Sequence, residues 1–171
     1  KLTKKPHIWH FREFGEEDFN MHPLCLKSCH YKKIGDNTDY IICNSKAVYN
    51  KFADKIKGKA KLSVVYNGIT PPKEINNHEN EKLRFLITGR ISEAKGQLDA
   101  VLAVKELISR GYSDFELLVA GPKNSAYPGL DNESVPSNVT FLGKRDDMQY
   151  LRSVTDVELV CSKMEAFGRV T

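Results

Sequence analysis

Seven short runs of apolar residues constrain the fold of this chain more than any other feature of its sequence. Most of the runs are continuous rather than alternating, which is typical of strands that are covered on both faces of a sheet. Strands of that kind belong mainly to parallel sheets, in which helices connect one strand to the next. The runs cover 7–11, 40–43, 62–66, 83–88, 115–120, 139–142 and 157–161.

Helical patterns separate several of these runs. Ser45 is a predicted N-cap, because apolar residues follow it at spacings of four. A longer pattern covers 97–110, and a shorter one covers 146–154. Alternating strands and helices predict an α/β fold with parallel sheets.

A polar stretch at 71–80, which opens with two prolines, is typical of a linker. We therefore predict one α/β segment at 1–72, a linker at 73–81 and a second α/β segment at 82–171. A helix is expected between the strands that flank 121–138, but no convincing helical pattern occurs there. Because the chain does not begin with Met, we expect it to be an excerpt of a longer one.

The composition excludes several classes of protein. No run approaches the roughly eighteen consecutive apolar residues of a membrane span, and we expect no secretory signal because no apolar run follows the basic first residues. The net charge is +4, with scattered Lys and Arg, which disfavours nucleic-acid binding and suits a face that meets phosphates or anionic lipid headgroups. The four cysteines lack the second ligand pair of a zinc site, so we expect reduced thiols in a cytosolic protein.

The first cluster with a chemical meaning follows the run at 83–88. Gly89 and Arg90 come directly after it, and Lys95 precedes the helical pattern at 97–110. In a doubly wound sheet this loop lies at the carboxyl end of a strand, where ligands bind, and helix-start amides favour an anion. The planar guanidinium of Arg90 supplies several N–H donors in a fixed geometry, and the ammonium of Lys95 supplies a mobile positive charge. Together the two suit a diphosphate. The alternative is that both are ordinary solvated charges.

The second cluster follows the last apolar run. Glu165 precedes Phe167 and Gly168, which we expect to open a helix, so that a carboxylate would stand beside free backbone amides. The carboxylate could hold sugar hydroxyls, and the amides could face phosphate oxygens. Alternatively, Glu165 only satisfies the helix dipole and Phe167 packs in the core. The residues alone support these two interpretations about equally.

A family resemblance favours the functional interpretation of both clusters. In the family's order, and over about the whole chain, the sequence resembles the retaining, two-lobed (GT-B) glycosyltransferases of family 4. The matching segments are 39–45, the Asn-Gly-Ile at 67–69, Gly89-Arg90 with Lys95-Gly96, 115–121, 139–143, and 165–171 as the start of an E-x7-E signature.

The resemblance implies an incomplete GT-B protein with Rossmann-like parallel sheets. Residues 1–72 would end the N-terminal, acceptor-side lobe, and 82–171 would begin the C-terminal lobe that binds the donor nucleotide. The implied reaction transfers a sugar from a nucleotide diphosphate sugar to a saccharide or lipid-linked acceptor, with retention of configuration, in polysaccharide or glycoconjugate biosynthesis. No cofactor is implied, and the sequence has no Asp-x-Asp motif to hold a metal. The expected location is the cytoplasm, with peripheral contact at the inner face of the membrane.

The resemblance also implies roles for individual residues in donor binding. Arg90 and Lys95 match the pair that binds the donor pyrophosphate. The backbone at Phe167 and Gly168 matches positions that contact the sugar and the phosphate. The implied donor-binding set is Gly89, Arg90, Lys95, Phe167, Gly168, Val170 and Thr171.

Two residues are implied in catalysis. Glu165 matches the first Glu of the signature, at the donor sugar, and the second would fall at position 173, beyond the end of this chain. His10 resembles the first-lobe histidine that faces the donor sugar, with His7, His22 and His30 as rival candidates.

Two other classes of protein share part of this pattern. A non-catalytic α/β nucleotide-binding or signalling module, such as a flavodoxin-like receiver, explains the alternating strands and helices. It does not explain Arg90, Lys95 and 165–168 together. A sugar phosphorylase of two-lobed architecture would need a lysine that carries pyridoxal phosphate, and nothing marks that lysine.

Overall fold

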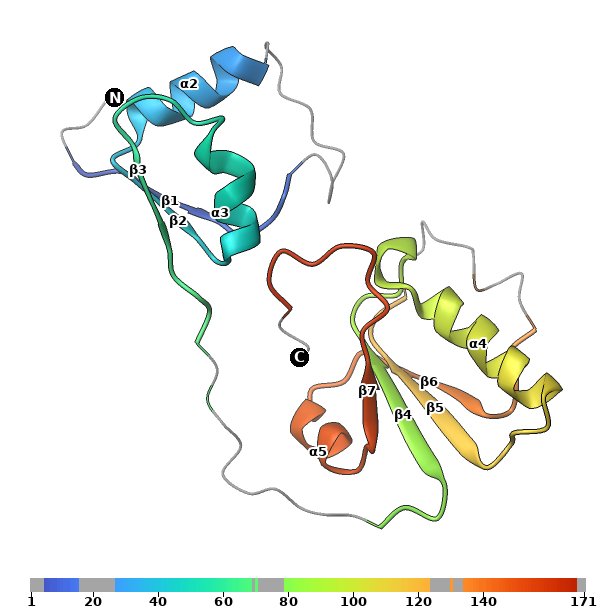
Figure 1. Cartoon of the computed structure of the whole chain (residues 1–171). Helices are drawn as coiled ribbons and strands as arrows, with labels where there is room; N and C mark the ends of the chain where they lie inside the picture. Colours follow the sequence, from blue (N-terminus) through green and yellow to red (C-terminus); the bar gives the residue numbers. More distant parts are fainter. Residues whose placement is uncertain are drawn as a thin grey trace. The chain divides into compact units, whose positions relative to one another are not determined.

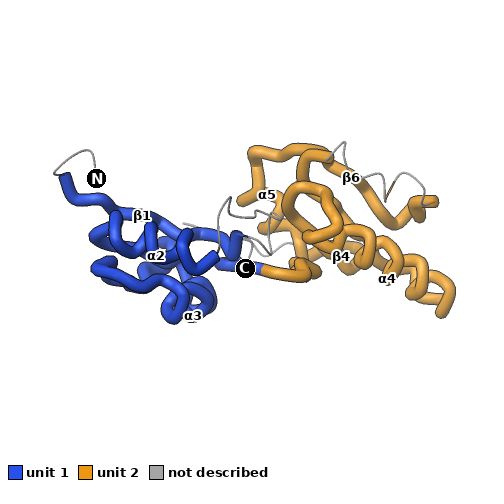
Figure 2. Tube along the Cα trace, turned by 90° about the horizontal axis from the view of Figure 1, so that it is seen from above, with its two compact units in different colours: residues 1–69, 165–168 blue, residues 70–164, 169–171 orange. Residues whose placement is uncertain are grey.

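The computed structural model describes residues 5–15, 27–68, 70, 79–123, 130 and 134–168. The chain forms two compact units. Unit 1 comprises residues 1–69 and 165–168, and unit 2 comprises residues 70–164 and 169–171 (Figure 2). Each unit has its own parallel sheet, of three strands in unit 1 and four in unit 2 among the described residues. The predicted α/β fold with parallel sheets is therefore confirmed.

The sheet of unit 1 has the strand order β1-β2-β3. Its central strand buries Ile41 and Cys43 completely, because both side chains pack in one core with residues of the two helices of this unit. Helix α2 precedes β2, and helix α3 connects β2 to β3 (Figure 1). The elements are β1 (Ile8–Phe11), α2 (Lys27–Asn37), β2 (Tyr40–Cys43), α3 (Lys46–Ala53) and β3 (Lys61–Val64).

The two helices of unit 1 differ in how readily they can be predicted from the sequence. Helix α3 begins after Ser45, as predicted, since the Ser45 hydroxyl accepts a hydrogen bond from the Val48 amide at 3.1 Å. Helix α2 was not predicted. It buries only Ile34 and Gly35, so its apolar stripe is too narrow to stand out in the sequence.

The sheet of unit 2 has the strand order β6-β5-β4-β7, and helices cover both of its faces (Figure 1). Val101 and Val104 of α4 pack with one set of strand residues, and Leu151 of α5 packs with the alternate set. This double burial explains the continuous apolar runs at β4 and β5. The elements are β4 (Leu83–Thr88), the 3₁₀ turn η1 (Glu93–Lys95), α4 (Gln97–Ser109), β5 (Phe115–Ala120), β6 (Val139–Gly143), α5 (Met148–Ser153) and β7 (Val157–Leu159).

Two details differ from the sequence expectations. Strand β7 ends at Leu159 rather than 161, because its register with β4 ends at the pair Ile87 and Leu159. Within 121–138, Leu130 packs into the core of unit 2.

Residues 165–168, which the sequence analysis assigned to the second segment, belong to unit 1. Ala166 is buried in the core of that unit, and the Phe167 ring lies 6.2 Å from the ring of Tyr66. The assignment of 1–72, 73–81 and 82–171 to lobe, linker and lobe remains a prediction.

Candidate functional site

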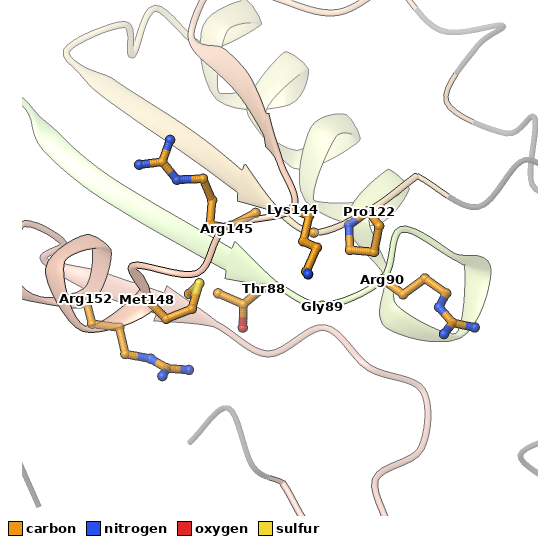
Figure 3. Close-up of a pocket in the computed structure, with 10 residues that line it drawn as sticks. Thr88, Gly89, Arg90, Pro122, Lys144, Arg145, Met148 and Arg152 are labelled. Carbon is orange, nitrogen blue, oxygen red and sulfur yellow. The ribbon is translucent and has the colours of Figure 1, made fainter.

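A pocket of about 240 Å³ lies at the carboxyl ends of β4, β5 and β6 in unit 2 (Figure 3). Parallel strands bring their carboxyl ends to one edge of a sheet, so three loops distant in the sequence meet there. The residues that line it are Thr88, Gly89, Arg90, Ala120, Gly121, Pro122, Lys144, Arg145, Met148 and Arg152.

Two glycines let the backbone pass close to itself at this pocket. The Gly89 amide donates to the Ala120 carbonyl at 2.9 Å, and the Gly121 amide donates to the Gly143 carbonyl at 2.8 Å. A Cβ atom on Gly121 would collide with the Gly89 carbonyl oxygen. Gly89 itself has φ 122°, which favours glycine. The predicted loop therefore has a fixed backbone shape.

A buried glutamine holds this loop in place. Gln97 is completely buried, and its side-chain amide donates to the carbonyls of Gly89 at 3.4 Å and Arg90 at 3.3 Å. Its side-chain oxygen accepts from the Ser92 amide at 3.2 Å. This role was not predicted from the sequence. The available signal was a polar residue at the first position of an amphipathic helix.

The two predicted pyrophosphate ligands occupy different positions around Gly89. Arg90 is exposed and lines the pocket (Figure 3). Lys95 is half-buried, ends the η1 turn and precedes α4 by two residues, close to the predicted helix start. Its side chain passes Gly89, since a Cβ on that glycine would lie 3.8 Å from the Lys95 Cδ.

The segment after β7 is anchored to the same loop. The Lys163 amide donates to the Ala94 carbonyl at 3.0 Å, and the Lys163 Nζ lies 2.6 Å from the Glu93 carboxylate. The hydrogen bond from Lys163 lowers the pKa of Glu93. Gly96 lies against Cys161, and a Cβ on Gly96 would collide with the Cys161 carbonyl. Thus the residues just before Glu165 are connected to the turn that carries Lys95.

Because of this close approach, we predict that Gly96→Ala destabilises the protein more than Gly111→Ala, which replaces another glycine with a positive φ. Gly96 has φ 70°, and a Cβ added to it would collide with its neighbours. Gly111 has φ 89°, but a Cβ added there would meet no other residue within 4 Å. We expect Gly111→Ala to cost about 1–2 kcal/mol, from backbone strain alone. Gly96→Ala should cost roughly 3 kcal/mol or more, because the clash adds to the strain. Urea unfolding of both variants checks this, and equal losses would contradict it.

The pocket wall is positively charged. Its only charged residues, among the described ones, are cationic, and three of these pair with carboxylates that do not line the pocket. The Arg145 Nε donates to Asp147 at 2.8 Å, which lowers the pKa of that carboxyl. In the described part of the chain the Arg90 guanidinium has no such partner. The four cations are Arg90, Lys144, Arg145 and Arg152.

Of these four cations, only Arg90 was predicted from the sequence. Lys144 and Arg145 directly follow β6, so the same rule about carboxyl ends of parallel strands could have found them. Arg152 lies on α5 and does not directly follow a strand, so only the packing of that helix brings it to the pocket.

His10, Glu165, Phe167 and Gly168 lie in unit 1. His10 is exposed on β1, opposite Ile42 in the register with β2. Glu165, Phe167 and Gly168 are half-buried. The expected helix does not begin within 165–168, which has no helical structure.

The remaining predicted positions lie outside the described residues or have other neighbours. Val170 and Thr171 are outside the described residues, as is the rival candidate His22. His7 is exposed, and the ring of His30 lies 5.7 Å from that of Tyr31.

Comparison with known proteins identifies the family. The family model described as glycosyl transferases group 1 matches residues 69–171. The chain belongs to this glycosyltransferase family. It is 28% identical to an uncharacterized glycosyltransferase of Methanocaldococcus jannaschii over 145 residues, which are 82% of this chain and 38% of that protein. It is 25% identical to the N-acetyl-alpha-D-glucosaminyl L-malate synthase of Bacillus anthracis over 147 residues, 79% of this chain and 38% of that enzyme.

The fold matches solved glycosyltransferases of GT-B type. The crystal structure of Anabaena HepE in complex with UDP and glucose has a TM-score of 0.73 and 20% identity, covering 98% of this chain and 49% of HepE. The fold is thus the parallel-sheet, Rossmann-like α/β fold of GT-B glycosyltransferases. This chain spans less than half the length of each of these three proteins.

Two features are absent from the described residues. No helix there has the length and apolar character needed to cross a membrane. No three His, Cys, Asp or Glu side chains in the same residues gather as a metal site would require.

Proposed function

We propose that the intact protein is a glycosyltransferase that moves a sugar from a nucleotide diphosphate sugar to a saccharide or lipid-linked acceptor. The observation that carries this proposal is the pocket with a cationic wall beside the Gly89-Arg90 loop, in a member of the glycosyl transferases group 1 family. The solved HepE complex, which contains UDP and glucose, supports a nucleotide sugar as the donor.

The loop at Gly89 suits the donor pyrophosphate. Arg90 has no carboxylate partner in the described part of the chain, so its fork of N–H donors can meet phosphate oxygens. Lys95 and the first amides of α4 would add a point charge and oriented dipoles. Transfer releases a nucleoside diphosphate, and these groups would stabilise the negative charge that grows on it. This charge stabilisation requires no divalent metal, and we propose a metal-independent reaction.

The donor sugar would be held by Glu165 and His10. Glu165 would accept hydrogen bonds from sugar hydroxyls, and His10 would face the sugar. The backbone at Phe167, Gly168, Val170 and Thr171 would complete the donor site. Retention of configuration, as in family 4, would follow from front-face attack of the acceptor within an ion pair, with no enzymic nucleophile.

The setting of the reaction is part of the proposal. We propose polysaccharide or glycoconjugate biosynthesis in the cytoplasm, with peripheral contact at the inner face of the membrane. The net charge of +4 supports contact with anionic lipid, and a lipid-linked acceptor would lie at that surface.

A donor panel tests this function. The intact protein is incubated with UDP-, GDP- and ADP-sugars in EDTA, and release of the diphosphate and the anomeric configuration of the product are followed by NMR. We expect release from at least one donor in EDTA, with retained configuration. Binding without any transfer would indicate the non-catalytic nucleotide-binding module instead, and no binding would contradict the donor site.

A further inference from the structure

Three polar side chains form a network beside the pocket, on the face of the unit 2 sheet that α5 covers. The Glu158 carboxylate accepts hydrogen bonds from Arg152 Nε at 3.0 Å and Arg152 Nη2 at 3.2 Å. The Thr88 hydroxyl donates to the same carboxylate at 3.0 Å. Glu158 thus connects three elements, namely the end of β4, the last turn of α5 and strand β7.

The packing of this face does not require a charged group at Glu158. In the register of β4 with β7, Glu158 lies opposite Leu86, which is completely buried and packs with Leu118 and Leu151. An apolar residue at 158 would extend that cluster. A partly exposed ion pair is a weak source of stability compared with apolar packing. The need to hold α5 on the sheet therefore does not explain why these charged side chains are present.

The network fixes the orientation of Arg152 at the pocket wall. Arg152 and Met148 lie four residues apart on α5, hence on one face of the helix, and both line the pocket (Figure 3). The carboxylate of Glu158 binds the Nε and Nη2 edge of the guanidinium in a fork. Of the five N–H donors of an arginine, this leaves three for a ligand. The Arg152 side chain keeps 41% of its surface exposed, against 21% for Glu158.

We infer that Arg152 is a further ligand-binding residue of this pocket, which donates hydrogen bonds to an anionic phosphate oxygen of the nucleoside diphosphate, and that Glu158 and Thr88 position it. The inference rests on the proposed function for the identity of the ligand. Because Glu158 neutralises much of its charge, Arg152 acts mainly through directed hydrogen bonds, whereas Arg90 acts also through its net charge. Lys at position 152 lacks the planar fork and cannot replace it.

The test compares binding of UDP and of uridine to the intact protein. Arg152→Ala and Arg152→Lys should each weaken UDP binding about tenfold, the loss of a charge-assisted hydrogen bond, and leave uridine binding unchanged. Glu158→Gln should have a smaller effect of the same kind, since the amide keeps one acceptor oxygen. Calorimetry measures UDP, ligand-observed NMR measures uridine, and circular dichroism checks the fold of each variant.

Arg110→Ala is the matched control. Arg110 is also an arginine at the end of a helix, paired with Glu106 at 2.8 Å, but it caps α4 and does not line the pocket. It should leave UDP binding unchanged. Unchanged UDP binding in a folded Arg152→Ala protein would overturn the inference, as would equal losses for UDP and uridine.

Failure of this inference is distinguishable from failure of the proposed function. If Arg90→Ala weakens UDP binding and Arg152→Ala does not, only the role of Arg152 is wrong. If the wild-type protein binds no nucleoside diphosphate, both are wrong.

Discussion

Glu165→Gln in the intact protein is expected to lower turnover by about two orders of magnitude, the usual cost of losing a group that positions the substrate. The carboxylate can accept hydrogen bonds from two sugar hydroxyls, whereas the glutamine amide keeps one acceptor and adds a donor. Positioning of the anomeric carbon would suffer, while the diphosphate contacts at Arg90 would remain. The affinity for a nucleoside diphosphate should therefore stay nearly unchanged. Steady-state kinetics and calorimetry on the same variant measure the two effects.

Glu106→Gln is a suitable control for this substitution. Glu106 is an exposed carboxylate of α4 whose partner is Arg110, outside the predicted site. It should leave turnover unchanged. Normal turnover of Glu165→Gln would contradict the role of Glu165. The E-x7-E signature adds an independent check, because it requires Glu at position 173 of the intact protein.

Arg90→Ala is expected to weaken binding of a nucleoside diphosphate by about ten- to a hundredfold. Each charge-assisted contact to phosphate contributes about 1.5–3 kcal/mol where water is excluded. Arg90→Lys should recover part of the loss, since it restores the charge but not the fork. Calorimetry in EDTA provides the measurement.

Arg110→Ala serves as the control here too, because it removes an arginine of the same unit without altering the pocket. Unchanged affinity of Arg90→Ala would rule out the pyrophosphate role. An absolute requirement for Mg²⁺ or Mn²⁺ in binding would instead contradict metal independence.

The central strands of unit 2 were predictable from local sequence because helices cover both faces of their sheet. β4 and β5 match their apolar runs at both ends, and Ser45 marks the start of α3 through its own hydroxyl. The loop at Gly89 could also be predicted, since its place follows from the strand that precedes it. Helix α2 could not, because a helix that buries one narrow stripe has no strong periodicity.

What the sequence by itself determined is therefore the set of elements, the parallel α/β architecture and the candidate residues next to strand ends. Only the tertiary structure decided which side chains share a pocket. Arg152 reaches the wall through the packing of α5, and Gln97 holds the Gly89 loop from inside the core. The reason is physical. Secondary structure depends on neighbours along the chain, whereas a binding site consists of contacts between segments whose distance in space the local pattern does not contain.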